Sequence, residues 1–445
     1  MAITLRLRTK DGTERVTVDP QISLPALLDL VAEQLKLDRQ EISVTRDGPG
    51  RDHLPHAGSL GVRHGDMLFL HYHAEREAVA RYEEKDPFKR LVSEGELRKL
   101  GVKEWTLTTF LDYRSQREYK LGKLPDPRCL YVSVDAGASN SFLGNMQSVN
   151  FACQRIGLLY GRFTDDGGVQ VDAIVEPAQE CTDTTIALAE DPFASKAHAV
   201  AGHLGLQLVG CIFAHPPRAY AFAINEVILA ARLHQRALDA AREAAADAQP
   251  AAAAGGAAAA PAEGDAPAEL PAQRFVTLKA RLVMEGEAIE GVATVEAYQV
   301  SEQCLALVQA DAFKQSATDA RCAKTAKSDC FFVIEQKESR KATAEHFVTR
   351  VHDMSRPYAS PLRTAFPVEN RPTQPQTQQS LREYLLRRRG EPFALVLADL
   401  HLLVFVANIL DMSTDMPVLC HAVAAGDSGQ LEGFQMMLHA FAEIE

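Results

Sequence analysis

The sequence predicts a multidomain chain of mixed α+β and α/β class, with a small N-terminal domain, a strand-rich core and a helical C-terminal domain. Three patterns predict this arrangement. Apolar and polar residues alternate at the start, strand-like runs separated by turn residues resume near residue 149, and helical periodicity dominates from about residue 378. A chain of 445 residues has room for about two to four domains with buried cores.

The first domain is predicted over residues 1–73. Alternation over residues 3–8 indicates a strand with one buried face, and Asp11-Gly12 predicts the tight turn into a second strand. Ser23 is placed to cap a helix over residues 24–37, and further strands follow it. A hairpin, a helix and then more strands within about 70 residues is the order of a ubiquitin-like (UBX-like) β-grasp domain.

The rest of the chain divides into three further parts: a connecting segment at 74–144, an α/β core at 145–355 and a helical domain at 356–445. The core is interrupted at 247–273 by an Ala/Pro/Gly-rich stretch, which we expect to be a disordered insertion without a function of its own.

An apolar run at 395–410 is too short to span a membrane and contains Asp399 and His401, so it is expected to form a buried helix within a longer helical stretch, 392–411.

Composition argues against several kinds of site. The net charge of -12 disfavours a general nucleic-acid surface. The eight cysteines are scattered without any Cys-x-x-Cys pair, so neither a structural zinc site nor another cofactor is expected. The N-terminus alternates apolar and charged residues and therefore does not read as a secretory signal, which predicts reduced thiols in the cytosol or nucleus.

One constellation in the core suggests chemistry. The stretch 209–216 (VGCIFAHP), together with Gln154-Arg155-Ile156-Gly157, resembles the MPN domain of zinc isopeptidases of the JAMM type that cut ubiquitin chains. That resemblance implies two histidines one residue apart, a serine, an aspartate eleven residues after the second histidine, and an upstream glutamate as general base. Three of these side chains would bind zinc and leave its fourth position to water.

This sequence departs from the pattern at most of those positions. Phe213 stands at the first histidine, Ala223 at the serine and Glu226 at the aspartate, and only His215 is kept. Gln154 stands at the glutamate base, and an amide cannot take up a proton near neutral pH. One histidine and one carboxylate hold zinc weakly, so we expect a catalytically inactive core with no metal.

The whole chain outside 247–273 resembles the nuclear protein localization protein 4 family. Five stretches in the same order carry the resemblance: 64–70 (HGDMLFL), 155–162 (RIGLLYGR), 296–304 (EAYQVSEQC), 366–371 (FPVENR) and 399–405 (DLHLLVF). The paired zinc fingers and the terminal zinc finger expected in fungal and animal members are missing, so the chain resembles the shorter plant-type form.

The resemblance implies a non-catalytic adaptor that recruits ubiquitinated proteins to the hexameric valosin-containing protein AAA ATPase for unfolding and proteasomal degradation. It further implies a heterodimer with the ubiquitin fusion degradation protein, a role in endoplasmic-reticulum-associated degradation, and binding of ubiquitin and polyubiquitin chains. Arg6 matches the arginine on the first strand with which related modules face the ATPase. We expect a cytoplasmic and nuclear protein recruited to the endoplasmic reticulum surface without membrane insertion.

Two other functions remain open at this stage. An active zinc isopeptidase would need the ligands that Phe213 and Gln154 replace. An inactive MPN scaffold subunit of a complex like the proteasome lid would not need the ubiquitin-like start and the helical end of this chain.

Overall fold

A computed structural model describes most of the chain, which forms two compact units, 1–110 and 111–445. The described residues are 2–9, 12–35, 37, 39, 42–48, 51–55, 58–72, 106–191, 193–248, 270–283 and 292–444. The first part of the predicted connecting segment, 74–105, and most of the predicted insertion, 249–269, lie outside them.

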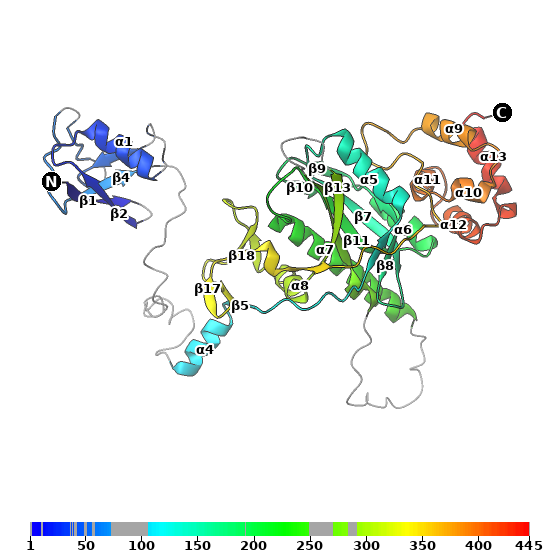
Figure 1. The fold of residues 1–445 in the computed structure, drawn as a ribbon, viewed down its shortest axis with the longest axis horizontal. Helices are drawn as coiled ribbons and strands as arrows, with labels where there is room; N and C mark the ends of the chain where they lie inside the picture. Colours follow the sequence, from blue (N-terminus) through cyan, green and yellow to red (C-terminus); the bar gives the residue numbers. More distant parts are fainter. Residues whose placement is uncertain are drawn as a thin grey trace. The chain divides into compact units, whose positions relative to one another are not determined.

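The N-terminal unit has the strand topology of a β-grasp domain (Figure 1). Its elements are β1 (Ile3–Thr9), β2 (Gly12–Val18), α1 (Leu24–Leu35), β3 (Ser43–Thr45) and β4 (Met67–His71). The sheet order is β2-β1-β4-β3, with β1 antiparallel to β2 and parallel to β4. Apolar residues recur along α1 at helical spacing and pack on alternate residues of the strands, which gives this domain its own core.

The second unit is built on a sheet of seven strands in the order β19-β13-β12-β11-β7-β8-β6. These strands are β6 (Val132–Val134), β7 (Arg155–Phe163), β8 (Val169–Val175), β11 (Gln207–Ala214), β12 (Val276–Val283), β13 (Val292–Val300) and β19 (Val348–Val351). Its central strands are covered on both faces, because apolar residues from both faces of β7 and β11 belong to packed clusters.

Helices cover the two faces of the sheet separately (Figure 1). Helix α5 (Ala136–Ser148) packs Phe142 and Met146 against one face, with Ile212 and Leu278. Helix α7 (Ile224–Ala248) packs against the other face, with Cys211. Side chains alternate along β12, so Lys279 lies on the α7 face while its neighbours Leu278 and Ala280 lie on the α5 face.

Two glycines of the RIGLLYGR motif are needed for close packing. A Cβ atom on Gly161 would lie 1.9 Å from the carbonyl oxygen of Gln170, at the point where the pairing of β7 with β8 shifts register. A Cβ atom on Gly157 would lie 2.6 Å from the side chain of Ile174. No larger residue fits either position without moving its neighbours.

Short elements extend the unit beyond the large sheet. They are α4 (Leu107–Ser115), β9 (Gln179–Cys181), β10 (Ile186–Leu188), α8 (Glu302–Gln309) and two three-stranded sheets, β14-β15-β18 and β17-β16-β5. Those sheets comprise β5 (Glu118–Leu121), β14 (Phe313–Gln315), β15 (Cys322–Thr325), β16 (Phe331–Ile334), β17 (Lys337–Ser339) and β18 (Lys341–Thr343). The rings of Phe313, Phe332 and Phe347 pack together beneath them.

The C-terminal helices pack on the sheet unit through α6 (Ala194–His203). They are α9 (Gln378–Arg387), α10 (Phe393–Leu397), α11 (Leu400–Val406), α12 (Asp415–Ala425) and α13 (Glu432–Phe441). Helices α11 and α12 contact α6, and one apolar cluster runs from α6 and β8 through all five helices. The helices and the sheet unit therefore share a core.

The prediction of one continuous helix over 392–411 is wrong. The structure has two helices there, α10 and α11, separated by Asp399. The buried Asp399 carboxylate accepts hydrogen bonds from the backbone N–H groups of His401 and Leu402, which caps α11. Its other oxygen accepts from the N–H groups of Ala365 and Phe366, at 2.7 and 2.8 Å. A capping carboxylate satisfies the first N–H groups of a new helix, so the chain restarts there.

The predicted insertion differs from the structure at both edges. Helix α7 continues to Ala248, and Pro271–Arg274 forms the 3-10 helix η2, in which Gln273 bonds to Arg128. Within the described residues, no helix is both long and apolar enough to cross a membrane.

Asp399→Ala is expected to lower the free energy of unfolding by about 3–5 kcal/mol, because four backbone N–H groups lose their acceptor inside the protein. Asp411 also accepts four hydrogen bonds, but it is exposed, and Asp411→Ala is expected to cost only about 1 kcal/mol. Urea unfolding of the two variants measures the difference, and equal losses would contradict the structural role given to Asp399.

Candidate functional site

The residues singled out in the core meet where β7, β11 and β12 adjoin the start of α7. Strand β11 pairs with β7 so that Ala214 lies opposite Arg155, which brings Gln154 and His215 to the same end of the sheet. Strand β12 runs parallel on the other side of β11 and places Lys279 opposite Phe213. Glu226 lies in the first turn of α7. The side chains of Gln154, Phe213, His215, Glu226 and Lys279 are buried.

Glu226 is held by three donors on a single oxygen. Its Oε2 accepts hydrogen bonds from Lys279 Nζ at 2.7 Å, from Arg218 Nη2 at 2.6 Å and from the backbone N–H of Ala223 at 2.9 Å. Burial alone would raise the pKa of Glu226, but the charges of Lys279 and Arg218 outweigh it and hold the pKa below its usual value. The carboxylate is therefore ionised, with three donors on Oε2, while its buried Oε1 has no hydrogen-bond partner.

Lys279 lies in the interior of the protein with no exposed surface. Burial lowers the pKa of Lys279 below its ordinary value, and the carboxylate of Glu226 opposes that shift and favours the ammonium form. The ammonium also lies 4.9 Å from the ring centroid of Phe222 and 5.7 Å from that of Phe213. A cation near the faces of two aromatic rings gains further stabilisation, and more so where water is excluded.

His215 is neutral in this setting. Its Nδ1 lies 2.6 Å from the carbonyl oxygen of Pro216, so Nδ1 carries the proton and donates it. Burial, with the charges of Lys279 and Arg218, lowers the pKa of His215 to about 3. The Nε2 atom is buried and has no hydrogen-bond partner.

Gln154 is fixed by the neighbouring loop. Its backbone N–H donates to Thr182 and its side-chain Nε2 donates to the carbonyl oxygen of Asp183. The side chain therefore offers a neutral amide at the end of β7, and neither of its polar atoms can act as a general base near neutral pH.

These residues do not fit a catalytic zinc ion. A divalent cation beside Glu226 would face the positive charges of Lys279 and Arg218, and Phe213 supplies no ligand. Across the described part of the chain, no group of three or more His, Cys, Asp or Glu side chains is arranged to hold a metal ion. In place of a metal, the arrangement holds a buried ammonium against a carboxylate.

The remaining predicted site residue, Arg6, belongs to the N-terminal unit. It is exposed on β1, and its Nε and Nη2 both donate to the carbonyl oxygen of Gly65, at 3.0 and 2.8 Å. The guanidinium is thereby held against the turn that leads into β4.

Neither Lys279 nor Arg218 could be recognised as a site residue from local sequence patterns. Lys279 lies in a strand between Thr277 and Arg281, where alternating polar residues are typical of a solvent-facing side. The long helix α7 covers that side of the sheet, which the local pattern does not reveal. Arg218 follows His215-Pro216 in a loop, and no local pattern indicates its partner eight residues later.

Two family models match this chain. The model described as "Nuclear pore localisation protein NPL4" matches residues 2–71, and the model described as "NPL4 family" matches residues 155–358. The Arabidopsis thaliana protein "NPL4-like protein 2" is 29% identical over 98% of both chains. The Dictyostelium discoideum "Nuclear protein localization protein 4 homolog" is 30% identical over 73% of this chain and 49% of its own.

The chain belongs to the NPL4 family. The resemblance inferred from the five sequence stretches is thereby confirmed. Alignment over nearly the full length of the Arabidopsis protein, and over about half of the Dictyostelium one, agrees with the plant-type form. Among solved structures, a β-grasp-like domain from Arabidopsis thaliana is 28% identical, covers 17% of this chain and 86% of its own, and has a TM-score of 0.16.

Three stretches that carry the NPL4 resemblance meet in the structure. Arg371 and Arg155 both form ion pairs with the buried carboxylate of Glu176, on its two oxygens. The side chain of Asn370 donates to the backbone carbonyl oxygen of Glu176 at 2.9 Å. Glu369 lies 2.9 Å from Nδ1 of His401 in α11. The FPVENR stretch thus ties the C-terminal helices to the edge of the sheet unit.

Lys279→Met is expected to lower the free energy of unfolding by about 3 kcal/mol, because it removes one partner of a buried ion pair and leaves Glu226 with Arg218 alone. Arg281→Met is a matched control on the same strand face, where Arg281 is 44% exposed and pairs with Glu296, and is expected to cost less than about 1 kcal/mol. Urea unfolding at neutral pH measures both variants. A Lys279 variant as stable as the Arg281 control would show that the buried ion pair contributes nothing to the free energy of unfolding.

His215 is expected to make stability fall in acid. The pKa of His215 in the folded state, about 3, lies below the ordinary value of 6.5. The contribution of the neutral ring to the free energy of unfolding is therefore complete above pH 6.5 and is lost as the pH falls toward 3. In that window the free energy of unfolding changes by about 1.4 kcal/mol per pH unit from this one group. His215→Gln should reduce the slope by that amount between pH 6 and 4, measured by urea unfolding at several pH values; an unchanged slope would mean that His215 is protonated in the folded protein.

Proposed function

We propose that this NPL4-family chain is a non-catalytic adaptor that binds ubiquitinated proteins and delivers them to the valosin-containing protein AAA ATPase for unfolding and proteasomal degradation. The observation that carries the proposal is the buried Lys279–Glu226 pair at the position where a related MPN isopeptidase would hold its metal. A family member with a degenerate centre and a ubiquitin-like module is suited to recruitment rather than to cleavage. The chain acts in this role as a heterodimer with the ubiquitin fusion degradation protein, in the cytoplasm and nucleus and at the endoplasmic reticulum surface.

The MPN assignment of the core is part of this proposal. It is supported by the position of His215 at the end of β11, of Gln154 before the paired strand β7, and of Glu226 in the first turn of α7. These are the places that the sequence resemblance gives to a zinc ligand, the general base and a second ligand. The core then keeps the frame of an isopeptidase while Phe213, Gln154 and Lys279 remove its chemistry.

The last helix offers a surface for ubiquitin. On α13, Met436 is 70% exposed, and Met437 and Phe441 are each 37% exposed. Exposed methionine and phenylalanine side chains gathered on one element are typical of a protein-binding surface, and methionine adapts readily to a partner. We assign this surface to ubiquitin, because the family resemblance places ubiquitin binding on the core and the helical tail.

The ubiquitin-like module is assigned to the ATPase. Arg6 is exposed on β1, and its guanidinium is pre-positioned by two hydrogen bonds to Gly65. A side chain that is already ordered loses less conformational entropy when it binds. Arg6 is therefore the residue of this module that we expect to face the ATPase.

The alternatives have less support. A zinc isopeptidase would have to accommodate a dication beside two buried or half-buried cations, which is unfavourable by Coulomb's law. A scaffold subunit of a complex like the proteasome lid accounts for an inactive MPN core, but it gives no role to the N-terminal β-grasp module.

Two changes are expected to separate the two binding activities. Deleting residues 1–73, or changing Arg6 to Ala, should weaken binding to the ATPase by about tenfold or more and leave binding to polyubiquitin unchanged. Met436→Asp should weaken binding to polyubiquitin and leave binding to the ATPase unchanged, because a charge at the centre of an apolar contact is costly to desolvate. Pull-downs of the full chain with purified ATPase, ubiquitin fusion degradation protein and polyubiquitin measure both.

Arg8→Ala is the matched control for Arg6, since Arg8 is an exposed arginine two residues further along the same strand face. It should leave both interactions intact. Loss of ATPase and ubiquitin binding together in any one variant would contradict the division of roles. Failure of the intact chain to bind the ATPase, alone or with its partner, would favour the scaffold alternative.

A further inference from the structure

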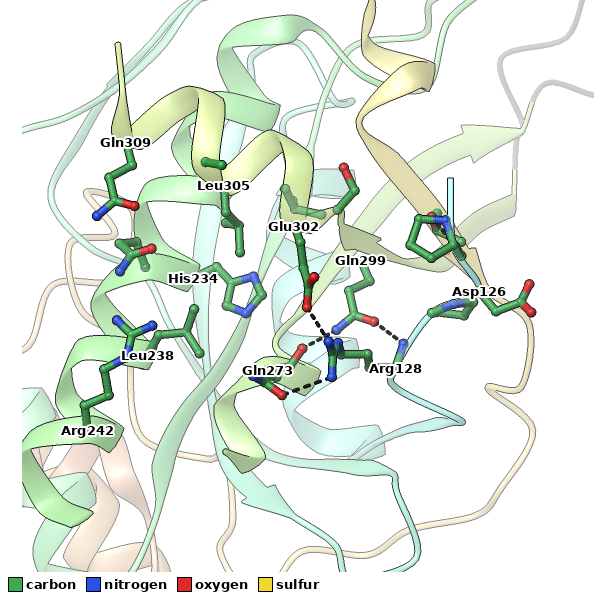
Figure 2. A pocket seen from close by; sticks show the side chains of 17 residues that line it. Asp126, Arg128, His234, Leu238, Arg242, Gln273, Gln299, Glu302, Leu305 and Gln309 are labelled. Atoms are coloured by element: carbon green, nitrogen blue, oxygen red, sulfur yellow. Dashed lines mark hydrogen bonds and ion pairs between the residues drawn. The ribbon is translucent and has the colours of Figure 1, made fainter. Parts of the chain in front are cut away.

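A second candidate site lies beside the middle of α7, away from the degenerate centre. A cavity of about 520 Å³ opens there between α7, α8, η2 and the loop 125–128 (Figure 2). Its volume is within the range of about 300–1,000 Å³ typical of small-molecule sites. His234 lines the cavity eight residues after Glu226, about 12 Å further along the helix axis.

His234 places a bare hydrogen-bond acceptor in the wall of this cavity. Its Nε2 lies 3.0 Å from the carbonyl oxygen of Ala272, and because a carbonyl can only accept, Nε2 carries the proton. Burial lowers the pKa of His234 to about 4, so the ring is neutral at physiological pH and Nδ1 keeps its lone pair. Nδ1 is buried and has no hydrogen-bond partner, and the side chain is 2% exposed.

The imidazole is held in one orientation. It stacks on the ring of Phe275 with centroids 5.0 Å apart and an interplanar angle of 11°. Figure 2 shows it directed toward the middle of the cavity, between Leu305 on α8 and Leu238 on α7. An orphan acceptor that is buried, rigid and directed inward costs free energy unless a ligand donates to it.

The opposite wall is preformed by side chains that satisfy one another. Gln299 accepts from the backbone N–H of Arg128 at 2.7 Å and donates to the carbonyl oxygen of Gln273 at 2.7 Å. The Arg128 guanidinium donates to the Gln273 side chain at 3.1 Å and pairs with Glu302. With two cations and two acids, Arg128, Arg242, Asp126 and Glu302, the lining carries no net formal charge.

The chemistry of the ligand follows from this lining. His234 requires an N–H or O–H donor, Leu238, Leu305 and Ala306 offer an aliphatic wall, and the side chains of Gln309 and Arg242 can donate to a carbonyl oxygen. A neutral lining disfavours a multiply charged ligand such as a phosphate. An amide N–H next to an aliphatic side chain and a carbonyl group meets all three requirements.

We propose that this cavity binds a small uncharged amide, the chemistry of a peptide unit with both ends blocked, through donation of an amide N–H to Nδ1 of His234. The proposal goes beyond the adaptor function and does not depend on it. The site shares no residue with the Lys279–Glu226 cluster, with Arg6 or with the exposed face of α13.

The test uses methyl NMR spectra of the full chain labelled at leucine methyl groups, titrated with N-acetyl-leucine dimethylamide. This probe has a single N–H and about 14 non-hydrogen atoms, for which a Kd on the order of 1 mM is expected. Its ester analogue, in which an oxygen atom replaces the N–H group, has the same number of non-hydrogen atoms but no donor. The parent compound should shift the methyl signals of Leu238 and Leu305 and bind about tenfold more tightly than the analogue.

His234→Phe should abolish that preference, because it keeps a ring on Phe275 and removes the acceptor. The comparison of two ligands on one variant is unaffected by a moderate loss of stability. His215→Gln, a change at another buried histidine, should leave the preference intact. Equal binding of both compounds to the wild-type chain, no binding of either at about 10 mM, or shifts confined to methyl groups outside the cavity would each overturn the proposal.

Discussion

The core of the larger unit depends on one buried ion pair, Glu226 with Lys279. It joins the first turn of α7 to the middle of β12, and Arg218 adds the preceding loop to the same carboxylate oxygen. Buried charges persist only when each has a partner, so this cluster fixes the position of the helix on the sheet and of the loop after β11 together. The rings of Phe213 and Phe222 lie beside the ammonium and exclude water from it.

The same cluster accounts for the character of the site. In a catalytic zinc centre, a cation of charge two is held by neutral and anionic ligands and leaves one position open to water. In this chain the cation is the ammonium group of Lys279. The Glu226 oxygen that faces it, Oε2, already accepts three hydrogen bonds and is not free to bind a metal ion. In the MPN core that we propose, a phenylalanine stands in place of a ligand and a glutamine in place of a base. The frame of the site would then be kept by interactions that have no catalytic use.

Much of the fold could be predicted from local patterns, and the parts that could not depend on distant partners. The hairpin and helix of the β-grasp domain, and α6, α7, α9 and α12, follow from alternation, helical spacing and capping residues. The break at Asp399 could not be predicted, because its carboxylate also binds N–H groups more than thirty residues earlier in the chain. That Phe213 and Gln154 stand at the positions of a zinc ligand and a general base is a prediction from motif spacing. Lys279 could not be predicted in this way, because its burial depends on a helix that is remote in sequence.

We propose that the core holds an ion pair where a related enzyme would hold zinc, and zinc analysis tests this proposal most directly. The chain is purified without chelators, incubated with zinc, freed of unbound metal and measured by mass spectrometry for zinc content and with polyubiquitin for cleavage. The account predicts far less than one zinc ion per chain and no cleavage, in the wild-type chain and in the Glu226→Ala variant alike. One tightly bound zinc per chain that is lost in that variant, with cleavage of the ubiquitin chains, would contradict it.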